Sequence, residues 1–245
     1  MKRKYLILGA SSEVGLAFIK NNDWLEDDEI VVQYCHNNKG LLDLKQKLSL
    51  NMTLLKADFK SEENTVNFCN NLKKIEFTPT HILHAPAIPI ANKRFTDILW
   101  SEAEDQINVQ CRSVYMILQS VIKKMVKNKY GRIIMILSSY TFNVPPKYIS
   151  AYIMTKYALM GLGKALVSEY GEKNIFINMV SPSMMETKFL NNVVNHSAIE
   201  ISAANNPLKR NASVNDVVPV IKYLFSENNT FTNGINIPIT GGEVY

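Results

Sequence analysis

ILSSYTFNVPPKYISAYIMTK, residues 136–156, places a hydroxyl, a phenol and an ammonium in one short stretch. Tyr152 and Lys156 are four residues apart in the segment 151–170, whose composition is typical of a helix, so both side chains lie on one face. A positive charge close to a tyrosine favours its phenolate. The pair is therefore a candidate proton donor and acceptor, although Tyr-x-x-x-Lys also arises in helices by chance.

A buried strand leads into this stretch. The apolar run 133–137 ends at Ser138, and Ser139 lies thirteen residues before Tyr152. Open parallel sheets bind ligands at such strand ends, although a strand-end hydroxyl also serves as a simple cap. The serine, tyrosine and lysine resemble the short-chain dehydrogenase/reductase family in order and spacing. The resemblance implies an α/β fold, a doubly wound parallel sheet of Rossmann type flanked by helices, in a single domain over residues 1–245.

The resemblance also implies a reaction, the transfer of hydride between a nicotinamide and a carbonyl or secondary alcohol. In the reduction, Tyr152 protonates the oxygen and Ser139 hydrogen-bonds the developing oxyanion. Lys156 lowers the pKa of Tyr152 and holds the nicotinamide ribose. Asn108, within the expected helix 98–126, holds a water that resupplies the proton, or is simply a solvent-facing residue. The implied catalytic residues are Asn108, Ser139, Tyr152 and Lys156.

The beginning of the chain has the layout of a phosphate-binding site. The apolar strand 5–8 leads through a glycine-containing turn into the helix 16–20. A helix N-terminus offers N–H groups and a partial positive charge, and glycines let a pyrophosphate approach the backbone. The family pattern T-G-x-x-x-G-x-G keeps Gly9 and Gly15 here, but Glu13 replaces the middle glycine. The implied cofactor contacts in this turn are Gly9, Ser11, Ser12, Val14 and Gly15.

Glu13 has two interpretations, and the sequence leaves both open. A carboxylate that faced the pyrophosphate would repel it. A carboxylate turned to solvent in the first helical turn would only interact favourably with the helix dipole.

The second strand, residues 30–35, ends without a carboxylate. An acidic residue there would bind the ribose hydroxyls of NAD and repel the 2′-phosphate of NADP, which neutral and basic groups tolerate or attract. We therefore expect NADP(H), with NAD(H) as the alternative, and contacts from His36, Asn37 and Lys39. Lys39 is equally consistent with an exposed charge that opens the helix 41–48.

Other cofactor contacts follow only from the resemblance. They are Asp58 near the adenine, Ala85 at the end of the fourth strand, Pro182 and Thr187 after the sixth strand, and Tyr152 and Lys156 themselves. Asp58 has the ordinary alternative of capping the helix that begins at Ser61. His84 and Ala85 replace two asparagines of the family motif N-N-A-G, and we interpret His84 as a packing or hydrogen-bonding residue. The segment 189–206 takes the place of the family's substrate-covering segment.

Composition excludes several other classes of protein. The 27 Lys+Arg and 22 Asp+Glu residues are spread along the chain, unlike the basic face of a nucleic-acid-binding protein. Cys35, Cys69 and Cys111 are far apart and predict neither a disulfide framework nor a metal site, which fits a reducing, cytoplasmic location. No apolar run approaches the ~18 residues of a membrane span. We expect no nucleic-acid, membrane or metal partner.

The expected partners are a small molecule and further copies of the chain. The helices 98–126 and 151–170 carry more apolar positions than one sheet face needs, and the family pairs them between subunits, so we expect a dimer or tetramer. The P-L-K-R to G-G ending resembles 3-oxoacyl-acyl-carrier-protein reductases, and Lys129 and Lys173 match arginines that contact the acidic carrier protein there. The alternatives are a sugar, sugar-nucleotide or other small-alcohol dehydrogenase, and a non-catalytic nucleotide-binding protein on the same fold.

Overall fold

One parallel sheet organises the chain in the computed structural model, which describes residues 2–187 and 196–243. Its strands are in the order β3-β2-β1-β4-β5-β6-β7, and every neighbouring pair is parallel. The strands are β1 (Lys4–Leu8), β2 (Glu29–Tyr34), β3 (Met52–Lys56), β4 (His81–His84), β5 (Gly131–Ile136), β6 (Ile175–Pro182) and β7 (Asn236–Ile239). All residues of β4 and β5 are buried, as expected for central strands covered on both faces.

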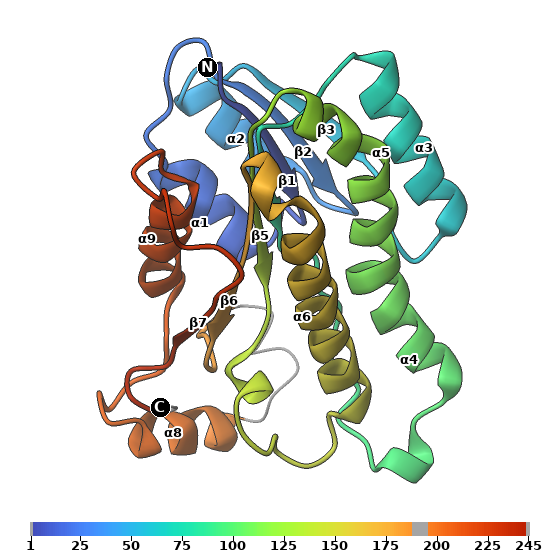
Figure 1. Ribbon diagram of the computed structural model, residues 1–245. Helices are drawn as coiled ribbons and strands as arrows, with labels where there is room; N and C mark the ends of the chain where they lie inside the picture. The colour runs from blue at the N-terminus through green and yellow to red at the C-terminus, as the bar shows by residue number, and fades with distance from the viewer. Residues whose placement is uncertain (1, 188–195, 244–245) are drawn as a thin grey trace.

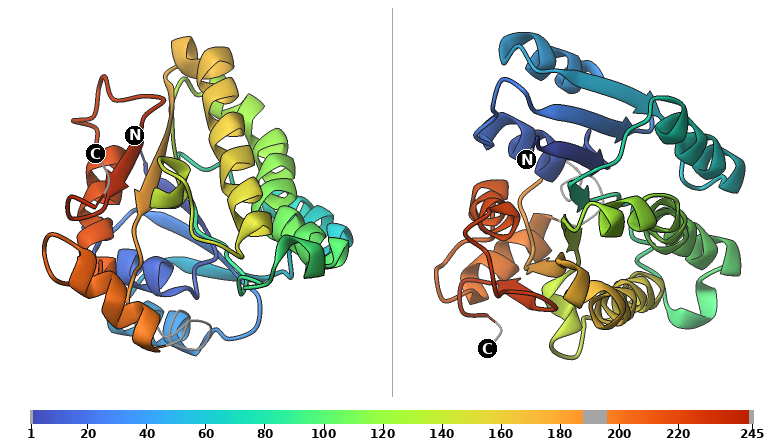
Figure 2. Two further views of the ribbon diagram at one scale, coloured as in Figure 1. Left: turned by 90° about the horizontal axis from the view of Figure 1, so that it is seen from below. Right: turned by 45° about the horizontal axis from the view of Figure 1, so that its top comes forward.

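Helices cover both faces of the sheet (Figure 1). The core on one face contains residues of α1 (Glu13–Asn21), α2 (Lys39–Lys47) and α9 (Val214–Phe225). The core on the other face contains residues of α3 (Glu62–Lys74), α5 (Ser113–Lys127) and α6 (Ser150–Tyr170). Figure 2 shows the two helical layers from two further directions. The prediction of a doubly wound parallel sheet flanked by helices is confirmed.

The strand order reverses between β1 and β4. From β1 the chain moves outward to β2 and β3, and then returns to place β4 on the other side of β1. The loops after β1 and β4 therefore leave in opposite directions, and doubly wound sheets bind their ligands at the carboxyl ends of such strands. The turn after Leu8 and the stretch after His84 lie at this position.

The long helix predicted over residues 98–126 is interrupted. A short 3-10 turn, η1 (Phe95–Asp97), precedes α4 (Trp100–Ile107), and a π-helical turn, η2 (Asn108–Arg112), joins α4 to α5. In η2 the N–H of Ser113 donates to the carbonyl of Asn108, five residues back. One extra residue in the turn rotates the side chains that follow it, and apolar periodicity alone does not reveal such an insertion.

Two 3-10 turns and one more helix complete the described elements. The turn η3 (Ser139–Thr141) follows β5, and η4 (Gly171–Lys173) follows α6. The predicted substrate-covering segment 189–206 lies partly outside the described residues, because the structure describes it only from 196 onward, where α8 (His196–Asn205) begins.

None of the helices in residues 2–187 and 196–243 is both long and apolar enough to cross a membrane. The three cysteines are free thiols. The same described residues contain no group of His, Cys, Asp or Glu side chains arranged to hold a metal ion.

Candidate active site

The turn after β1 is compact because of two glycines. Gly9 has φ +69°, and a Cβ on it would lie 2.6 Å from the backbone nitrogen of Pro86, beyond the end of β4. A Cβ on Gly15 would lie 2.6 Å from the carbonyl oxygen of Ala10. Larger residues at either position would push the turn away from β4 or open it. The glycines thus let the turn pack closely against the backbone that follows β4.

Ser12 caps the helix that this turn opens. Its Oγ accepts the N–H of Gly15 at 3.1 Å, and its own N–H donates to the carbonyl of Gly9 at 2.9 Å. Both bonds orient the start of α1, whose first-turn N–H groups and dipole favour an anion. Ser11 is half-buried and Val14 is buried in the same turn. Glu13, the first residue of α1, is half-buried.

One glutamine fixes the turn to the neighbouring strands. Gln33 is buried near the end of β2, and its Oε1 accepts the N–H of Gly9 at 2.8 Å. Its Nε2 donates to the carbonyl of Ala57, just after β3, at 2.6 Å. The carboxyl ends of three strands are therefore joined by a single side-chain amide. The sequence analysis did not single out Gln33, although a glutamine in an otherwise apolar strand was a visible signal.

The ends of β2 and β3 carry the residues assigned to the adenosine half of a cofactor. His36, Asn37 and Lys39 are exposed, and Oδ1 of Asn37 accepts the N–H of Lys39 at 2.9 Å. Burial and the nearby carboxylate of Asp58 raise the pKa of the Cys35 thiol, so the two strand ends are close to each other.

Asp58 does not cap α3. Its Oδ1 accepts the N–H of Lys60 at 3.0 Å, whereas the helix cap is Ser61, whose Oγ accepts the N–H of Asn64 at 3.2 Å. Asp58 therefore lies just after β3 without the ordinary capping role, and its contact near the adenine stays a prediction.

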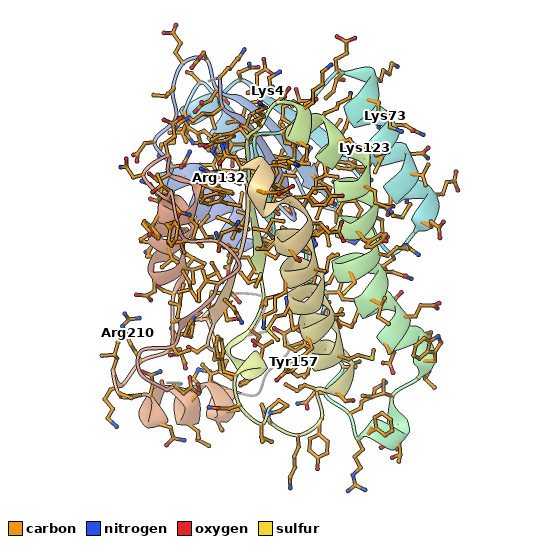
Figure 3. All side chains as sticks on the ribbon, viewed as in Figure 1. Lys4, Lys73, Lys123, Arg132, Tyr157 and Arg210 are labelled. Carbon is orange, nitrogen blue, oxygen red and sulfur yellow. The ribbon has the colours of Figure 1, made fainter. Side chains whose placement is uncertain are left out.

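Tyr152 and Lys156 lie one turn apart near the start of α6. Lys156 is 4% exposed, and its Nζ donates to the carbonyl of Ile136, the last residue of β5, at 2.9 Å. The same Nζ is 5.4 Å from the centroid of the half-buried Tyr152 ring. Figure 3 labels Tyr157, which follows Lys156, near the end of the sheet where the strands terminate. The pair therefore lies beside the carboxyl end of β5.

The pKa values of this pair differ from the expectation. Burial raises the pKa of Tyr152 to about 12, because it disfavours the phenolate; the Ser138 hydroxyl opposes the rise by hydrogen bonding, and the nearby Tyr140 adds to it. Lys156 was expected to lower this pKa, but its ammonium bonds the Ile136 carbonyl and lies over the ring. Burial lowers the pKa of Lys156 itself to about 8. At neutral pH, Tyr152 is a neutral phenol and Lys156 is mostly charged.

Both serines after β5 lie at this site. Ser139 is buried, begins η3, and accepts the N–H of Phe142 on its carbonyl at 3.0 Å. Ser138, also buried, is the serine whose hydroxyl stabilises the Tyr152 phenolate. Only Ser139 was predicted to act in the reaction. In the sequence, the only sign that Ser138 also takes part was that its hydroxyl is next to that of Ser139.

The remaining predicted residues border the same end of the sheet. Asn108 is half-buried at the start of η2, and the turn η2 contacts α6 through Sγ of Cys111, 3.4 Å from the carbonyl of Thr155. Ala85 is buried directly after β4 and donates its N–H to the carbonyl of Leu8 at 3.0 Å.

Pro182 ends β6 opposite Ile239, and the residues after it are held by a second connection. Met185 forms an isolated bridge with Ala212, and the N–H of Glu186 donates to the carbonyl of Ala212 at 3.0 Å. Thr187 is half-buried at the end of the described residues. The predicted residues that follow β1 to β6 thus all lie at the carboxyl end of the sheet.

The chain is similar to known proteins along most of its length. Residues 14–243 match a family model described as enoyl-(acyl carrier protein) reductase. The chain belongs to the short-chain dehydrogenase/reductase family. A 3-oxoacyl-[acyl-carrier-protein] reductase of Buchnera aphidicola subsp. Acyrthosiphon pisum (strain APS) is 32% identical over 144 residues, which are 58% of this chain and only 57% of that reductase.

Two further comparisons extend over more of the chain. The 3-oxoacyl-[acyl-carrier-protein] reductase of Buchnera aphidicola subsp. Baizongia pistaciae (strain Bp) is 25% identical over 206 residues, 84% of this chain and 83% of that one. A solved 4-hydroxyisoleucine dehydrogenase complexed with NADH superposes with a TM-score of 0.86 at 26% identity, over 98% of each chain. The prediction that the chain is a short-chain dehydrogenase/reductase is therefore confirmed.

In this member of the family, alanine substitutions of Ser138 and Ser139 should have unequal effects. We expect Ser139→Ala to lower kcat by about 10²–10³-fold, the usual loss of one oxyanion donor. Ser138→Ala should lower kcat by about tenfold or less, because it removes only a contact to Tyr152. Steady-state kinetics of both variants measure this order. The reverse order would assign the oxyanion contact to Ser138.

Glu13→Gly compares the two interpretations of the family's altered glycine turn. We expect the melting temperature to fall and the NADPH dissociation constant to change less than about threefold. The substitution removes a first-turn charge worth about 0.3–1 kcal/mol and adds a flexible residue. Glu13→Gln is the matched control, because it removes the charge alone. A tenfold gain in NADPH affinity with an unchanged melting temperature would show that the carboxylate faces the pyrophosphate.

Proposed function

We propose that this protein is an NADP(H)-dependent oxidoreductase that transfers hydride between a nicotinamide and a carbonyl or secondary alcohol. One observation carries the proposal: Tyr152 and Lys156 lie one turn apart beside the end of β5, and the Ser138 hydroxyl hydrogen-bonds Tyr152. The same edge of the sheet carries the glycine turn that opens α1.

The residues fit a dinucleotide cofactor. The turn at Gly9 and the capped start of α1 suit a pyrophosphate, and they lie at the carboxyl end of β1, beside the stretch after β4. The exposed polar residues after β2 suit an adenosine ribose, and we assign the nicotinamide ribose to Lys156. When bound, the nicotinamide supplies the hydride in the reduction and accepts it in the oxidation.

The side chains then perform the acid–base part of the reaction. The neutral phenol of Tyr152 donates its proton to the oxygen that becomes negative as the carbonyl is reduced. Ser139 donates a hydrogen bond to that oxygen, and Ser138 stabilises the phenolate left on Tyr152. Lys156, whose Nζ lies 5.4 Å from the centroid of the Tyr152 ring and donates to the Ile136 carbonyl, is assigned to the nicotinamide ribose. We assign to Asn108 the water that returns a proton.

The preference for NADP(H) follows from the residues after β2, where His36, Asn37 and Lys39 are exposed without a neighbouring carboxylate on that loop. Fluorescence titrations with NADPH and NADH test the cofactor proposal. We expect a lower dissociation constant for NADPH, and tighter binding of NADH would contradict the preference. The NADH complex of the similar 4-hydroxyisoleucine dehydrogenase makes this comparison necessary.

The substrate class that we favour is a 3-oxoacyl thioester, because two reductases of this specificity are among the similar proteins. A small secondary alcohol is the second candidate, since a 4-hydroxyisoleucine dehydrogenase matches 98% of this chain. Following NADPH absorbance with a panel of both classes distinguishes them. Binding of NADPH without turnover of any carbonyl or alcohol in the panel would favour a non-catalytic nucleotide-binding protein.

The two lysines expected to contact a carrier protein lie far from Tyr152 in the same chain. Lys129 precedes β5 and Lys173 precedes β6, so both are at the amino ends of the strands. Nδ2 of Asn174 donates to the carbonyl of Lys129 at 2.9 Å and holds the two loops together. Figure 3 labels Arg132, close to Lys129 in the chain, at the opposite end of the sheet from Tyr157. A carrier held by these lysines would therefore lie at the end of the sheet opposite Tyr152 of the same chain.

We further propose a homo-oligomer, dimer or tetramer, located in the cytoplasm. The outer surfaces of the helices from α4 to α6 expose large side chains, namely Trp100, Tyr115, Met154 and Tyr157. Such residues are enriched where subunits meet. Light scattering should give at least twice the chain mass of 27.8 kDa. A monomer at all concentrations would contradict the proposed assembly.

A further inference from the structure

His84 is a buried histidine whose ring makes no hydrogen bond within residues 2–187 and 196–243. It ends β4 and is 1% exposed, yet neither Nδ1 nor Nε2 has a partner there. A buried polar group without a partner loses about 1–3 kcal/mol relative to a satisfied one. Such a group in a native fold requires an explanation. The other histidine of β4, His81, contacts Oγ1 of Thr80 at 2.8 Å through its Nδ1.

The His84 ring faces the layer that contains Lys156. Side chains alternate along a strand, and Ile82, two residues earlier, belongs to the core that includes α6. His84 is opposite Met135 on β5, and the next residue of β5, Ile136, accepts the Lys156 ammonium. Burial, and then the charge of Lys156, lower the pKa of His84 to about 3. The imidazole is therefore neutral and close to the ammonium.

A second buried acceptor lies on the helix beside this strand end. Gln110 in η2 is fully buried; its Nε2 donates to Oε1 of Gln106 at 2.7 Å, while its own Oε1 has no partner within the described residues. Nε2 of Gln106 donates in turn to the carbonyl of Pro89, in the stretch that follows β4. The residue after Gln110, Cys111, contacts the residue before Lys156. The amides of Gln106 and Gln110 therefore connect the stretch after β4 to η2, which itself contacts α6.

The ammonium of Lys156 needs acceptors in this environment. It has three N–H donors, and the carbonyl of Ile136 accepts one of them. A buried charge is tolerated only when its remaining donors are hydrogen-bonded. A neutral imidazole offers one acceptor nitrogen, and the amide oxygen of Gln110 offers another.

We infer that one buried water accepts a hydrogen bond from the Lys156 ammonium and donates to His84 and Gln110, so that these two side chains position the ammonium beside Tyr152. The inference rests on the proposed function, in which Lys156 holds the nicotinamide ribose. His84 is a positioning residue in this arrangement, because it acts on the reaction only through Lys156. It takes the place of an amide side chain with an imidazole of comparable hydrogen-bonding capacity.

Among residues 2–187 and 196–243, the groups that face Lys156 are uncharged. Cys111 approaches from η2, and burial raises the pKa of its thiol to about 11. His84 approaches from β4, the Ile136 carbonyl from β5, and Tyr152 from the same helix. None of these groups carries a charge at neutral pH, so the protonated state of Lys156 depends on hydrogen-bond acceptors. Loss of an acceptor must lower its pKa.

The test compares His84→Leu, His84→Gln and the control His81→Leu in the full-length protein. The Lys156 titration is followed by NMR of the nitrogen-15-labelled ammonium, and the alkaline limb of the kcat profile is measured with NADPH. We expect His84→Leu to lower both midpoints by about one pH unit, a tenfold change. His84→Gln restores an acceptor and should return both midpoints toward the wild-type values.

The control separates positioning from packing. His81→Leu removes a buried histidine from the same strand but on the opposite face, so it should lower stability and leave the Lys156 midpoint unchanged. Gln110→Leu should shift the midpoint in the same direction as His84→Leu, and it replaces that variant if His84→Leu does not fold. An unchanged Lys156 midpoint in the variant that folds would overturn the inference.

The two readouts also separate this inference from the proposed function. If the wild-type protein reduces no carbonyl, the proposed function fails, and the NMR titration still decides the role of His84. If turnover is present but the Lys156 midpoint does not respond to His84→Leu or Gln110→Leu, only the inference fails.

Discussion

Tyr152→Phe should lower turnover by about 10²–10⁴-fold while the NADPH dissociation constant changes by less than about twofold. The substitution removes one hydroxyl, and that hydroxyl is the proposed proton donor. Its neutral form predominates at neutral pH, since an ordinary tyrosine is already neutral there and burial raises the pKa of Tyr152 further, to about 12. The ring itself, which lies 5.4 Å from the Lys156 ammonium, remains in place. Steady-state kinetics and fluorescence titration measure the two effects separately.

Tyr157→Phe is the matched control for that experiment. Tyr157 lies on the same helix, five residues after Tyr152, and is exposed, so its hydroxyl should contribute little. Parallel losses of turnover and of cofactor binding in Tyr152→Phe would show that the phenol holds the cofactor rather than donating a proton. An equal loss of turnover in Tyr157→Phe would show that the effect is not specific to the site.

Lys156→Met should reduce turnover and cofactor affinity together, and it should also change how stability depends on pH. Burial lowers the pKa of Lys156 from 10.5 to about 8, so the folded protein binds this proton more weakly than the unfolded chain. The charged lysine therefore opposes folding below pH 8, and the penalty disappears as pH rises toward 10.5. The shift corresponds to about 3 kcal/mol.

Denaturant unfolding of the cofactor-free protein at pH 7 and at pH 10.5 measures this dependence. The unfolding free energy of Lys156→Met minus that of the wild type should be about 3 kcal/mol larger at pH 7 than at pH 10.5. Comparing pH values cancels the constant cost of leaving the Ile136 carbonyl unpaired. Lys164→Met, on the exposed face of the same helix, should show no such difference. If the unfolding free energy of Lys156→Met minus that of the wild type did not depend on pH, hydrogen bonds would already offset the burial of the ammonium.

The sequence predicted the parts of this structure that depend on local pattern. Apolar runs such as 133–137 and the spacing of Tyr152 and Lys156 determine a buried strand and a shared helix face, and neither requires knowledge of distant residues. The strand order followed from the resemblance to a family, because the pattern alone does not say which strands are neighbours.

The features that the sequence did not predict depend on contacts between elements that are distant in the chain. The bond between Lys156 and the carbonyl of Ile136 joins a helix to a strand and redirects an ammonium that the sequence placed beside a phenol. The role of Ser138 depends on the burial of Tyr152, which only the folded structure reveals. The π-helical turn at Asn108 differs from a continuous helix by one residue, and the apolar pattern tolerates this difference.

The amide of Gln33 has a consequence for attempts to engineer the protein. It binds Gly9 and Ala57 at once, so it sets the spacing of the strand ends that would hold the two halves of a dinucleotide. The loop at residues 36–39, by contrast, has exposed side chains at His36, Asn37 and Lys39. Substitutions that aim to exchange one nicotinamide cofactor for the other can therefore be made at His36, Asn37 and Lys39. Gln33 should be kept in such variants, because its two hydrogen bonds hold the strand ends at their present spacing.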